Sequence, residues 1–440
     1  MNPKSSRTVA IIAGGRVIDP ASGLDAVGDV YLKNGRVERI ELRKRSLVPP
    51  ARIESDADVW DARGCIVSPG FVDLHVHLRE PGREDEETIL TGARAAAAGG
   101  FTSVCCMPNT DPPIDSQETV QFVLDQAREA ACRVYPIGAI TQGQKGEFLT
   151  EIGDMVAAGA VAISEDGKSV ASAEVQRRAM EYVRMFDIPV ISHCEDPTLA
   201  GAGIMHEGTV STRLGMPGIP DAAEEIMVAR DIQLAAFTGA RLHIAHVSTA
   251  GSARLIRRAK RDGVRVTAEA TPHHFSLIDR LIADSFDTNL RVNPPLRTEK
   301  DRRAIIAALA DGALDCIATD HAPHSIEEKD NEFDVAPNGM IGLETALGLV
   351  GKMLVRPGHL EWPQALKLLT INPAQVVKIP AGLLAGEQPA DITVFDPEAE
   401  WVVDAGRFYS RSKNSPFVGW TLVGRVKLTI CGGKVTHIDE

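Results

Sequence analysis

Aromatic side chains, cysteines and long apolar runs are all scarce in this chain of 440 residues. Phe, Trp and Tyr together make up 5% of the sequence, and the seven cysteines include no CxxC pair. No apolar run reaches the roughly 18 residues that a membrane-spanning helix requires. The odd cysteine count, mostly in apolar strand-like runs, favours buried free thiols in a reducing compartment over a disulfide framework.

Positive charge is also in deficit, because 47 Lys and Arg residues face 60 Asp and Glu residues. No basic stripe is present, which disfavours nucleic acid as a partner. The first residues, Met1 to Arg7, lack the apolar region and cleavage site of a signal peptide. We therefore expect a cytoplasmic protein that acts without a membrane. Its 44% of hydrophobic residues are ample for a large core.

The two ends of the chain carry the same pattern of a strand, a Gly-Gly turn and a returning strand. The glycine pairs are Gly14-Gly15 and Gly432-Gly433. A further hairpin turns at Asn34-Gly35, and residues 390–396 add one more strand. These patterns predict one small β domain to which both termini contribute.

The middle of the chain alternates apolar strand candidates with Ala-rich amphipathic helices. Strands are expected at 66–74, 101–106, 133–138, 160–164, 188–193, 241–247, 264–270 and 314–319. Helices are expected at 86–98, 116–131, 172–186, 222–238, 251–261 and 299–310. Because no Gly-rich phosphate loop follows the first strand, the alternation favours a closed (β/α)8 barrel of the TIM type over an open doubly wound sheet.

The expected fold class is therefore α/β, with two domains. A metal-dependent hydrolase barrel would span residues 66–379, and a small composite β-sandwich domain would combine residues 1–65 and 380–440. An acidic loop at 327–332, after the last barrel strand, is either a lid or a solvated face.

The most informative motif runs from Asp73 to Arg79, directly after the first barrel strand begins. If that strand continues, its alternation places His75 and His77 on one face, where two imidazoles can bind one divalent metal. Arg79 lies two positions further on and suits an anion, because its guanidinium offers a fork of donors. Taken alone, the two histidines are equally compatible with ordinary strand residues.

Metal-ligand residue types recur where the other strands end, which is where barrels of this kind collect functional groups. They are His75 and His77, Glu165 and Asp166, His193, His246 and Asp320. Four histidines with a bridging carboxylate suit two divalent ions, zinc first, with manganese, cobalt and iron as alternatives. Such a pair makes a hydroxide nucleophile available near neutral pH and polarises a carbonyl oxygen. Asp320 would then shuttle the proton from the hydroxide to a leaving nitrogen.

Other histidines fit this set less well. His243 has the opposite parity to His246, so on a regular strand it would face the helices. His273 and His274 follow the seventh strand and could support the ligands from behind. We favour a structural role for both, because the other ligands are already accounted for.

The ordered set HxH, Asp, His, His, Asp on an eight-stranded barrel resembles the amidohydrolase superfamily. The finer motifs are similar to those of bacterial class I dihydroorotases, whose binuclear zinc centre is bridged by an aspartate. The matching strings are Asp73 to Gly82, Met107 to Thr110, Asn293 to Arg297, Asp320 to His324 and Asn338 to Thr345. The resemblance covers nearly the whole chain, and the strings HLREPG and DHAPH are specific.

The resemblance implies two zinc ions per chain. The implied ligands are His75, His77 and Asp320 for the first ion, His193 and His246 for the second, and Asp166 as the bridge between them. Many amidohydrolases use a carboxylated lysine as the bridge. Here Lys168 lies two residues late, so Asp166 is favoured and Lys168 stays a minor alternative.

The resemblance also implies a substrate and the residues that bind it. The reaction would be the reversible cyclisation of N-carbamoyl-L-aspartate to (S)-dihydroorotate in de novo pyrimidine (UMP) biosynthesis, with Asp320 as the catalytic acid and base. The implied substrate contacts are Arg79, Asn109 and His324 for the carboxylate, Asn293 and the backbone of Asn338 and Gly339 for the ring, and His77 beside them.

Two other functions stay open. The first is another cyclic amidase, acting on hydantoins, dihydropyrimidines or allantoin; such relatives usually use the carboxylated lysine and lack the arginine of HLRE. The second is an inactive dihydroorotase-like subunit that scaffolds aspartate transcarbamoylase. Such subunits typically lose metal ligands, whereas every ligand position is filled here. Association with further copies of the chain, or with aspartate transcarbamoylase, also stays open.

Overall fold

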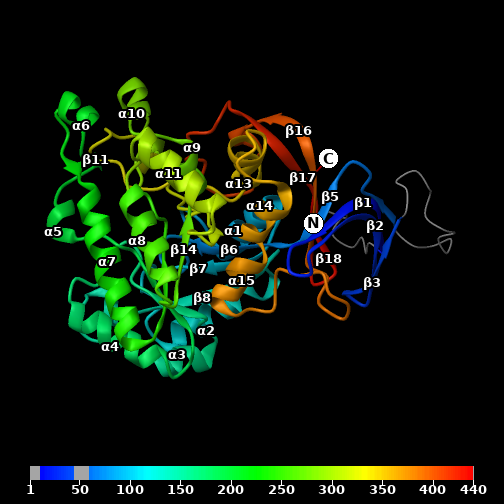
Figure 1. Cartoon of the computed structure of the whole chain (residues 1–440), viewed down its shortest axis with the longest axis horizontal. Helices are drawn as coiled ribbons and strands as arrows, with labels where there is room; N and C mark the ends of the chain where they lie inside the picture. Colours follow the sequence, from blue (N-terminus) through cyan, green and yellow to red (C-terminus); the bar gives the residue numbers. More distant parts are fainter. Residues whose placement is uncertain (1–9, 44–58, 440) are drawn as a thin grey trace.

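Two sheets of eight strands each organise the chain in the computed structural model (Figure 1). The structure describes residues 10–43 and 59–439. The expectation for Met1 to Arg7, and the parts of the expected terminal domain at 1–9, 44–58 and 440, lie outside the described residues.

The first sheet is the barrel that the alternating pattern predicts. Its parallel strands follow the order β15-β14-β13-β10-β9-β8-β7-β6. They are β6 (Phe71–Val76), β7 (Phe101–Cys106), β8 (Arg133–Ala139), β9 (Ala162–Ser164), β10 (Pro189–Ser192), β13 (Arg241–Ile244), β14 (Val266–Ala270) and β15 (Cys316–Ile317). A parallel bridge between Val76 and His321 joins the two ends of this order, so the barrel is nearly closed.

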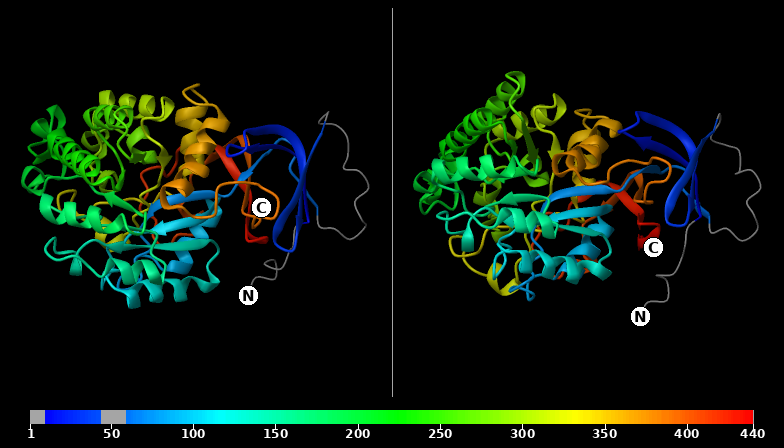
Figure 2. Two further views of the ribbon diagram at one scale, coloured as in Figure 1. Left: turned by 60° about the horizontal axis from the view of Figure 1, so that its bottom comes forward. Right: turned by 90° about the horizontal axis from the view of Figure 1, so that it is seen from below.

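Helices surround the barrel, and the two views of Figure 2 show them on its outside. The longer ones are α1 (Ile89–Ala98), α2 (Gln117–Gln126), α3 (Ile152–Ala158), α4 (Ala173–Val183), α7 (Asp221–Thr238), α8 (Ala250–Arg261), α11 (Glu299–Ala310), α14 (Trp362–Leu369) and α15 (Ile371–Val377). Short ones are α5 (Pro197–Ala200), α6 (Thr209–Leu214), α9 (Pro272–Ser276), α10 (Arg280–Ser285), α12 (Ile326–Lys329) and α13 (Ala346–Val350). Hydroxyl side chains begin several of them: the side chains of Thr88, Ser116 and Thr249 each accept a backbone N–H of the first turn.

The second sheet combines strands from both ends of the chain, as expected. Its order is β18-β17-β16-β5-β1-β2-β3, with β4 paired to β1. The strands are β1 (Ile11–Asp19), β2 (Leu24–Lys33), β3 (Arg36–Leu42), β4 (Val59–Asp61), β5 (Ile66–Pro69), β16 (Ile392–Val402), β17 (Thr421–Cys431) and β18 (Lys434–Ile438). The short strands β11 (Met205–His206) and β12 (Gly218–Ile219) form a separate pair.

The strand expected at 66–74 is two strands that belong to different sheets. β5 pairs with β1 and β16 in the terminal sheet, whereas β6 enters the barrel. Gly70 lies between them, and a Cβ there would meet Thr102 Oγ1 at 2.1 Å, so only glycine fits this close approach. The domain limits predicted at 65/66 and 379/380 stay predictions.

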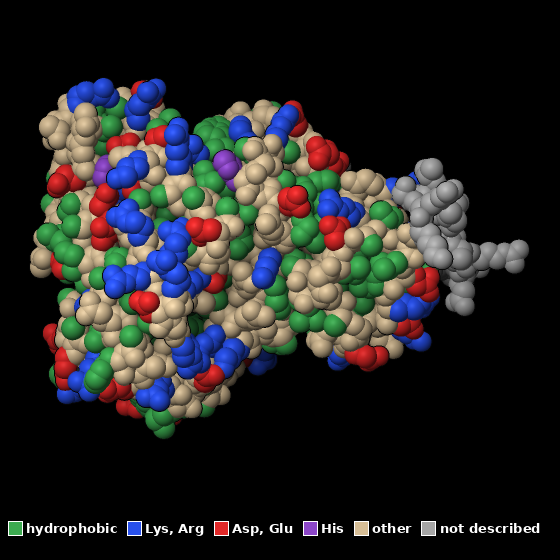
Figure 3. Space-filling model, viewed as in Figure 1, with side chains coloured by type: hydrophobic (Ala, Val, Ile, Leu, Met, Phe, Trp, Pro, Cys, Tyr) green, Lys and Arg blue, Asp and Glu red, His purple; other side chains and the backbone are tan. Residues whose placement is uncertain are grey.

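The barrel is filled by apolar side chains from several of its strands. Val72, Ile137, Ile191 and Cys316 pack in one buried cluster with residues of α15. On the surface, Figure 3 shows basic and acidic side chains interspersed over one face rather than gathered by sign. In the described part of the chain, no helix is long and apolar enough to cross a membrane.

Candidate metal centre

Four histidines and two aspartates meet at the carboxyl end of the barrel, where the sequence predicts them. All six are buried, with exposed fractions between 0% and 8%. They are His75 in β6, His77 just after it, Asp166 after β9, His193 after β10, His246 after β13 and Asp320 after β15. The structure therefore brings together residues that lie up to 245 positions apart in the chain.

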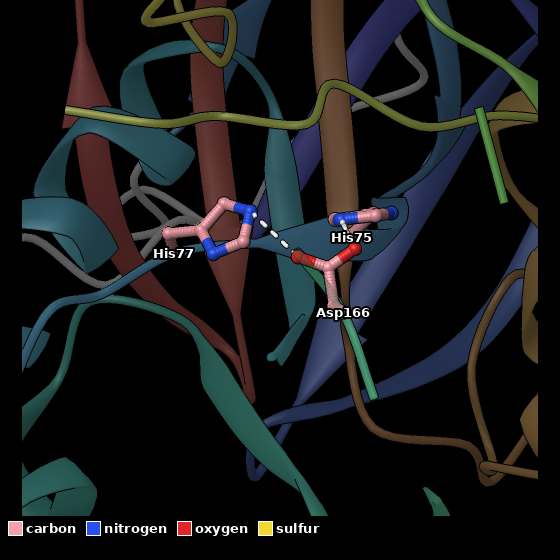
Figure 4. A group of neighbouring side chains, drawn as sticks. All are labelled: His75, His77 and Asp166. Carbon is pink, nitrogen blue, oxygen red and sulfur yellow. Dashed lines mark ion pairs between the residues drawn. The ribbon is translucent and has the colours of Figure 1, made fainter. Parts of the chain in front are cut away.

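Asp166 lies at the centre of this group. Its Oδ1 is 3.2 Å from His75 Nε2, 3.6 Å from His246 Nε2 and 3.8 Å from His193 Nδ1. Its Oδ2 is 3.5 Å from His77 Nε2, and Figure 4 shows the carboxylate between His75 and His77. Two sets of three metal-ligating groups share Asp166, so this carboxylate has the position of a bridge.

Asp320 lies against the first pair of histidines. Its Oδ1 is 3.1 Å from His77 Nε2 and 3.5 Å from His75 Nε2. Burial opposes the ionisation of both aspartates, but the neighbouring histidines lower the pKa of Asp166 and of Asp320 below the ordinary value. An ionised carboxylate is also the form that a metal requires.

The donor set fits divalent metal ions. His75 is 0% exposed, and its Nε2 has no hydrogen-bond partner among the described residues. His193 Nδ1 and His246 Nε2 lie 2.9 Å apart while both face the same carboxylate. Imidazole nitrogens and carboxylate oxygens gathered in this way form a ligand set that suits zinc and related ions.

Lys168, the alternative bridge, is exposed and belongs to none of the metal-ligating groups in the described part of the chain. Asp166 is buried and faces all four histidines. The geometry thus favours the aspartate over the lysine.

Glu269 supports the centre from behind, and the sequence analysis missed it. Its Oε1 lies 2.9 Å from His75 Nδ1 and its Oε2 lies 3.0 Å from His243 Nε2. Burial opposes ionisation here as well, but hydrogen bonds from His243 and His75 lower the pKa of Glu269 to about 2. Histidines that bind metals commonly donate the other ring N–H to such a carboxylate.

The prediction that His243 faces the helices is wrong. Its ring contacts Glu269, which in turn contacts His75, whereas its neighbours Leu242 and Ile244 pack in the core that includes helix residues. β13 ends at Ile244, and His246 has a φ of 32°. Strand alternation therefore does not extend from His243 to His246.

The two histidines after β14 differ in their contacts, and their structural role stays a prediction. His274 Nδ1 lies 2.8 Å from Thr271 Oγ1 and its Nε2 lies 3.0 Å from Pro294 O, so both ring nitrogens have partners. Burial lowers the pKa of His274 to about 4. His273 is also buried, and its Nε2 has no hydrogen-bond partner among the described residues.

Two asparagines predicted to contact a substrate border the metal-ligating group. Asn109 Oδ1 is 2.8 Å from His77 Nδ1, and Asn109 Nδ2 is 3.4 Å from Asp166 Oδ2. Asn293 Nδ2 is 3.5 Å from His193 Nε2, and its buried Oδ1 is without a partner among the described residues.

The remaining predicted contacts form a second cluster. Arg79 Nη2 lies 3.2 Å from His324 Nε2, and the same ring nitrogen lies 2.8 Å from Asn338 O. Gly339 adjoins this cluster, since a Cβ there would lie 3.1 Å from His324 Nε2. Arg79 and His324 together offer donors for an anion beside the metal-ligating group.

A cavity of about 900 Å³ lies elsewhere, where α1 and the segment after Gly342 approach β16, β17 and β18. Its lining includes Arg94, Glu344, Trp401 and Arg425 and contains none of the predicted site residues. This cavity therefore does not mark the position of the metal-ligating group.

Comparison with known proteins agrees with the site. Residues 64–252 match the family model described as Dihydro-orotase-like. The dihydroorotase of Pelotomaculum thermopropionicum is 53% identical over 430 residues, covering 98% of this chain and 99% of that protein. The dihydroorotase of Anaeromyxobacter dehalogenans is 52% identical over 434 residues, covering 98% of both chains.

Solved structures share the fold at lower identity. The L-hydantoinase (dihydropyrimidinase) from Arthrobacter aurescens superimposes with a TM-score of 0.85 at 24% identity, over 98% of this chain and 96% of that one. A D-hydantoinase gives a TM-score of 0.82 at 20% identity, over 98% of this chain and 95% of that one. The two dihydroorotases are about half identical to this chain over nearly its full length, whereas the solved structures share only the fold. The chain therefore belongs to the dihydroorotase family.

Proposed function

We propose that this protein is a zinc-dependent cyclic amide hydrolase that interconverts N-carbamoyl-L-aspartate and (S)-dihydroorotate in de novo UMP biosynthesis. The observation that carries the proposal is the Asp166 carboxylate facing four buried imidazoles, in a chain about half identical to dihydroorotases. Ring closure releases water, and ring opening consumes it.

Two zinc ions per chain are the proposed cofactor. His75, His77 and Asp320 would hold one ion, His193 and His246 would hold the other, and Asp166 would bridge them. When bound, such ions lower the pKa of water toward neutrality and polarise a carbonyl oxygen. Glu269 would keep the proton of His75 on Nδ1, which leaves Nε2 free to bind.

Asp320 is the proposed acid and base. In ring opening, its carboxylate accepts a proton from the attacking water and delivers it to the ring nitrogen as the C–N bond breaks. In ring closure, it takes a proton from the carbamoyl nitrogen as that nitrogen attacks the side-chain carboxyl carbon, and the proton leaves with the water.

The second cluster would orient the substrate. Arg79, Asn109 and His324 would bind its carboxylate, and Asn293 with the backbone of Asn338 and Gly339 would bind the ring, which His77 also borders. The 3.2 Å distance between Arg79 Nη2 and His324 Nε2 supports this pair as a site for one carboxylate.

Metal content and dihydroorotate hydrolysis, measured on one sample purified without chelator, test the proposal. Close to two zinc ions per chain with turnover would support it. No turnover in a fully metallated sample would refute it. Zinc with turnover only of rings that lack the carboxylate would move the function to a hydantoinase-like amidase, whose fold this chain shares.

The scaffold alternative predicts protein without metal that co-purifies with aspartate transcarbamoylase. All six proposed ligands are present and close together, which favours the enzyme. The cytoplasm is the proposed location, because all seven cysteines are free thiols. Association with further copies of the chain, or with aspartate transcarbamoylase, stays a prediction that molecular mass in solution tests.

A further inference from the structure

Glu86 joins the two side chains that are proposed to bind the substrate carboxylate. It lies on the loop between β6 and α1 and is 1% exposed. Its Oε2 is 3.0 Å from Arg79 Nε, and its Oε1 is 2.9 Å from His324 Nδ1. One buried carboxylate therefore contacts both donors at once.

Arg79 Nη2 and His324 Nε2 lie 3.2 Å apart, and His324 Nε2 also lies 2.8 Å from Asn338 O. Arg79 uses Nε to reach Glu86 and to donate to Pro323 O at 3.0 Å, while its Nη2 points to His324 Nε2. His324 uses Nδ1 to reach Glu86, so its Nε2 is on the opposite side of the ring. An arginine has a long flexible chain, and such anchoring removes rotamer freedom before a ligand arrives.

Glu86 is itself held in place. Its backbone N–H donates to Arg83 O at 3.0 Å, and its backbone O accepts from Ser412 Oγ at 2.7 Å. Ser412 comes from the segment between β16 and β17, far along the chain. The loop therefore cannot carry the carboxylate away without breaking contacts to both neighbours.

The same region also has the spacing of a metal site, since Glu86, His324 and Glu328 offer three ligand atoms close together. The charges argue against a cation there. Arg79 Nε lies 3.0 Å from one oxygen of Glu86, and Arg83 Nη2 lies 3.0 Å from the other and 2.8 Å from Glu328. Two guanidinium groups already neutralise these two carboxylates, so little negative charge is left to bind a cation.

We propose that Glu86 is a positioning residue that orients Arg79 and His324 as a pair and thereby tightens the binding of a substrate that carries a carboxylate. The inference rests on the proposed function, because it deepens the specificity of the same site. Glu86 does not contact the reacting atoms, so its effect belongs to substrate binding and not to the chemical step.

The test compares the wild-type enzyme with Glu86→Gln and Glu86→Asp. We measure kcat and KM for dihydroorotate hydrolysis, and the Kd of orotate by calorimetry as a readout that needs no turnover. Glu86→Gln weakens charge-assisted contacts to Arg79 and His324, as well as to Arg83, so KM and Kd should each rise ~10-fold or more while kcat changes by less than ~3-fold. Glu86→Asp keeps the charge but is one methylene shorter and reaches one partner only, so an intermediate rise is expected.

Asp85→Asn is the matched control, because Asp85 is an exposed carboxylate on the same loop whose ion pair among the described residues is with Arg83. Its KM should stay at the wild-type value. Zinc content and melting temperature of every variant show whether the fold and the metal centre are intact.

Several outcomes would overturn the inference. They are unchanged KM and Kd in both Glu86 variants, a fall in kcat without a rise in KM, or a third zinc ion in wild type that is lost in Glu86→Gln. If Glu86→Gln does not fold, Glu86→Asp is judged by the same criteria. Failure of the proposed function is recognised separately, because the wild-type enzyme itself would then not turn over dihydroorotate.

Discussion

Glu269→Gln is the sharpest test of the metal centre, because it changes hydrogen bonding without changing size. The carboxylate accepts from His75 Nδ1 at 2.9 Å, His243 Nε2 at 3.0 Å and the backbone N–H of His246 at 3.3 Å. An amide has one accepting oxygen and one donating NH₂ group. In the variant, the NH₂ group must therefore face a histidine nitrogen that carries a proton in the wild type.

His75 cannot reverse its tautomer and still bind zinc, since a proton on Nε2 would block the lone pair that the ion requires. The amide oxygen therefore stays with His75, and the NH₂ group turns to His243. The proton of His243 then moves to Nδ1, 2.8 Å from Thr267 Oγ1. His75 then keeps a hydrogen-bond acceptor, but this acceptor is a neutral amide oxygen and no longer a carboxylate. Removing such a carboxylate behind a metal-binding histidine weakens metal binding by ~10–100-fold, which is about 1.4–2.8 kcal/mol.

The zinc affinity is measured by competition with a chelating dye, and zinc per chain is measured after dialysis. Asp231→Asn is the control, because Asp231 is an equally buried carboxylate that contacts Ser192 and Arg230 but none of the proposed ligands. We expect weaker zinc binding in Glu269→Gln alone. A zinc affinity within twofold of wild type in Glu269→Gln would refute the argument from the tautomer of His75.

Three further predictions concern catalysis, metal and pH. Asp320→Asn removes the proposed proton carrier, so kcat should fall by ~10²–10⁴-fold; zinc per chain, measured in parallel, separates this loss from the loss of an ion. Chelation should abolish turnover and lower the melting temperature, because zinc at 100 times its Kd stabilises the fold by about 2.7 kcal/mol per site; a melting temperature that zinc does not restore would contradict this. Burial raises the pKa of Glu344 from 4.5 to about 7, so stability should fall as pH rises through this interval, because the unfolded carboxyl ionises first. Between pH 4.5 and 7, this carboxyl should lower the free energy of unfolding of the wild type by up to about 3 kcal/mol, and Glu344→Gln should lack that fall in denaturation experiments. The same pH dependence in the variant and the wild type would show that the carboxyl is already ionised in the fold.

Most strand positions could be predicted because each barrel strand is an apolar run bounded by turn residues or by the start of a helix. The run at 66–74 was the exception, because its apolar character continues through the change from one sheet to the other. What separates β5 from β6 is the close approach of Gly70 to Thr102. That approach depends on the packing of β6 against β7, and the local sequence does not encode it.

The proposed ligands were predictable for a different reason: parallel strands bring their carboxyl ends to one edge, whatever their separation in sequence. The carboxylates that support them were not predictable in this way. Glu269 and His75 are 194 residues apart, and Glu86 and His324 are 238 residues apart. Glu269 did leave a signal, since a lone charge in a buried strand requires a partner. Glu86 left none, because it lies in the acidic run Glu84 to Glu87, which is typical of a solvated loop.

The backbone at the strand ends explains why strand alternation gave the wrong orientation for His243, although the predicted ligands lie close together. Arg79, His246 and Asp320 have φ values of 61°, 32° and 49°, and each lies just beyond a barrel strand. A residue with a side chain rarely adopts positive φ, and where it does the strain commonly marks a functional site. Here the turn takes each side chain out of the two faces of its strand and directs it into the site. The parity of a strand therefore predicts the residues that fill the barrel and the position of His75, whereas Arg79, His246 and Asp320 reach the site through turns at positive φ.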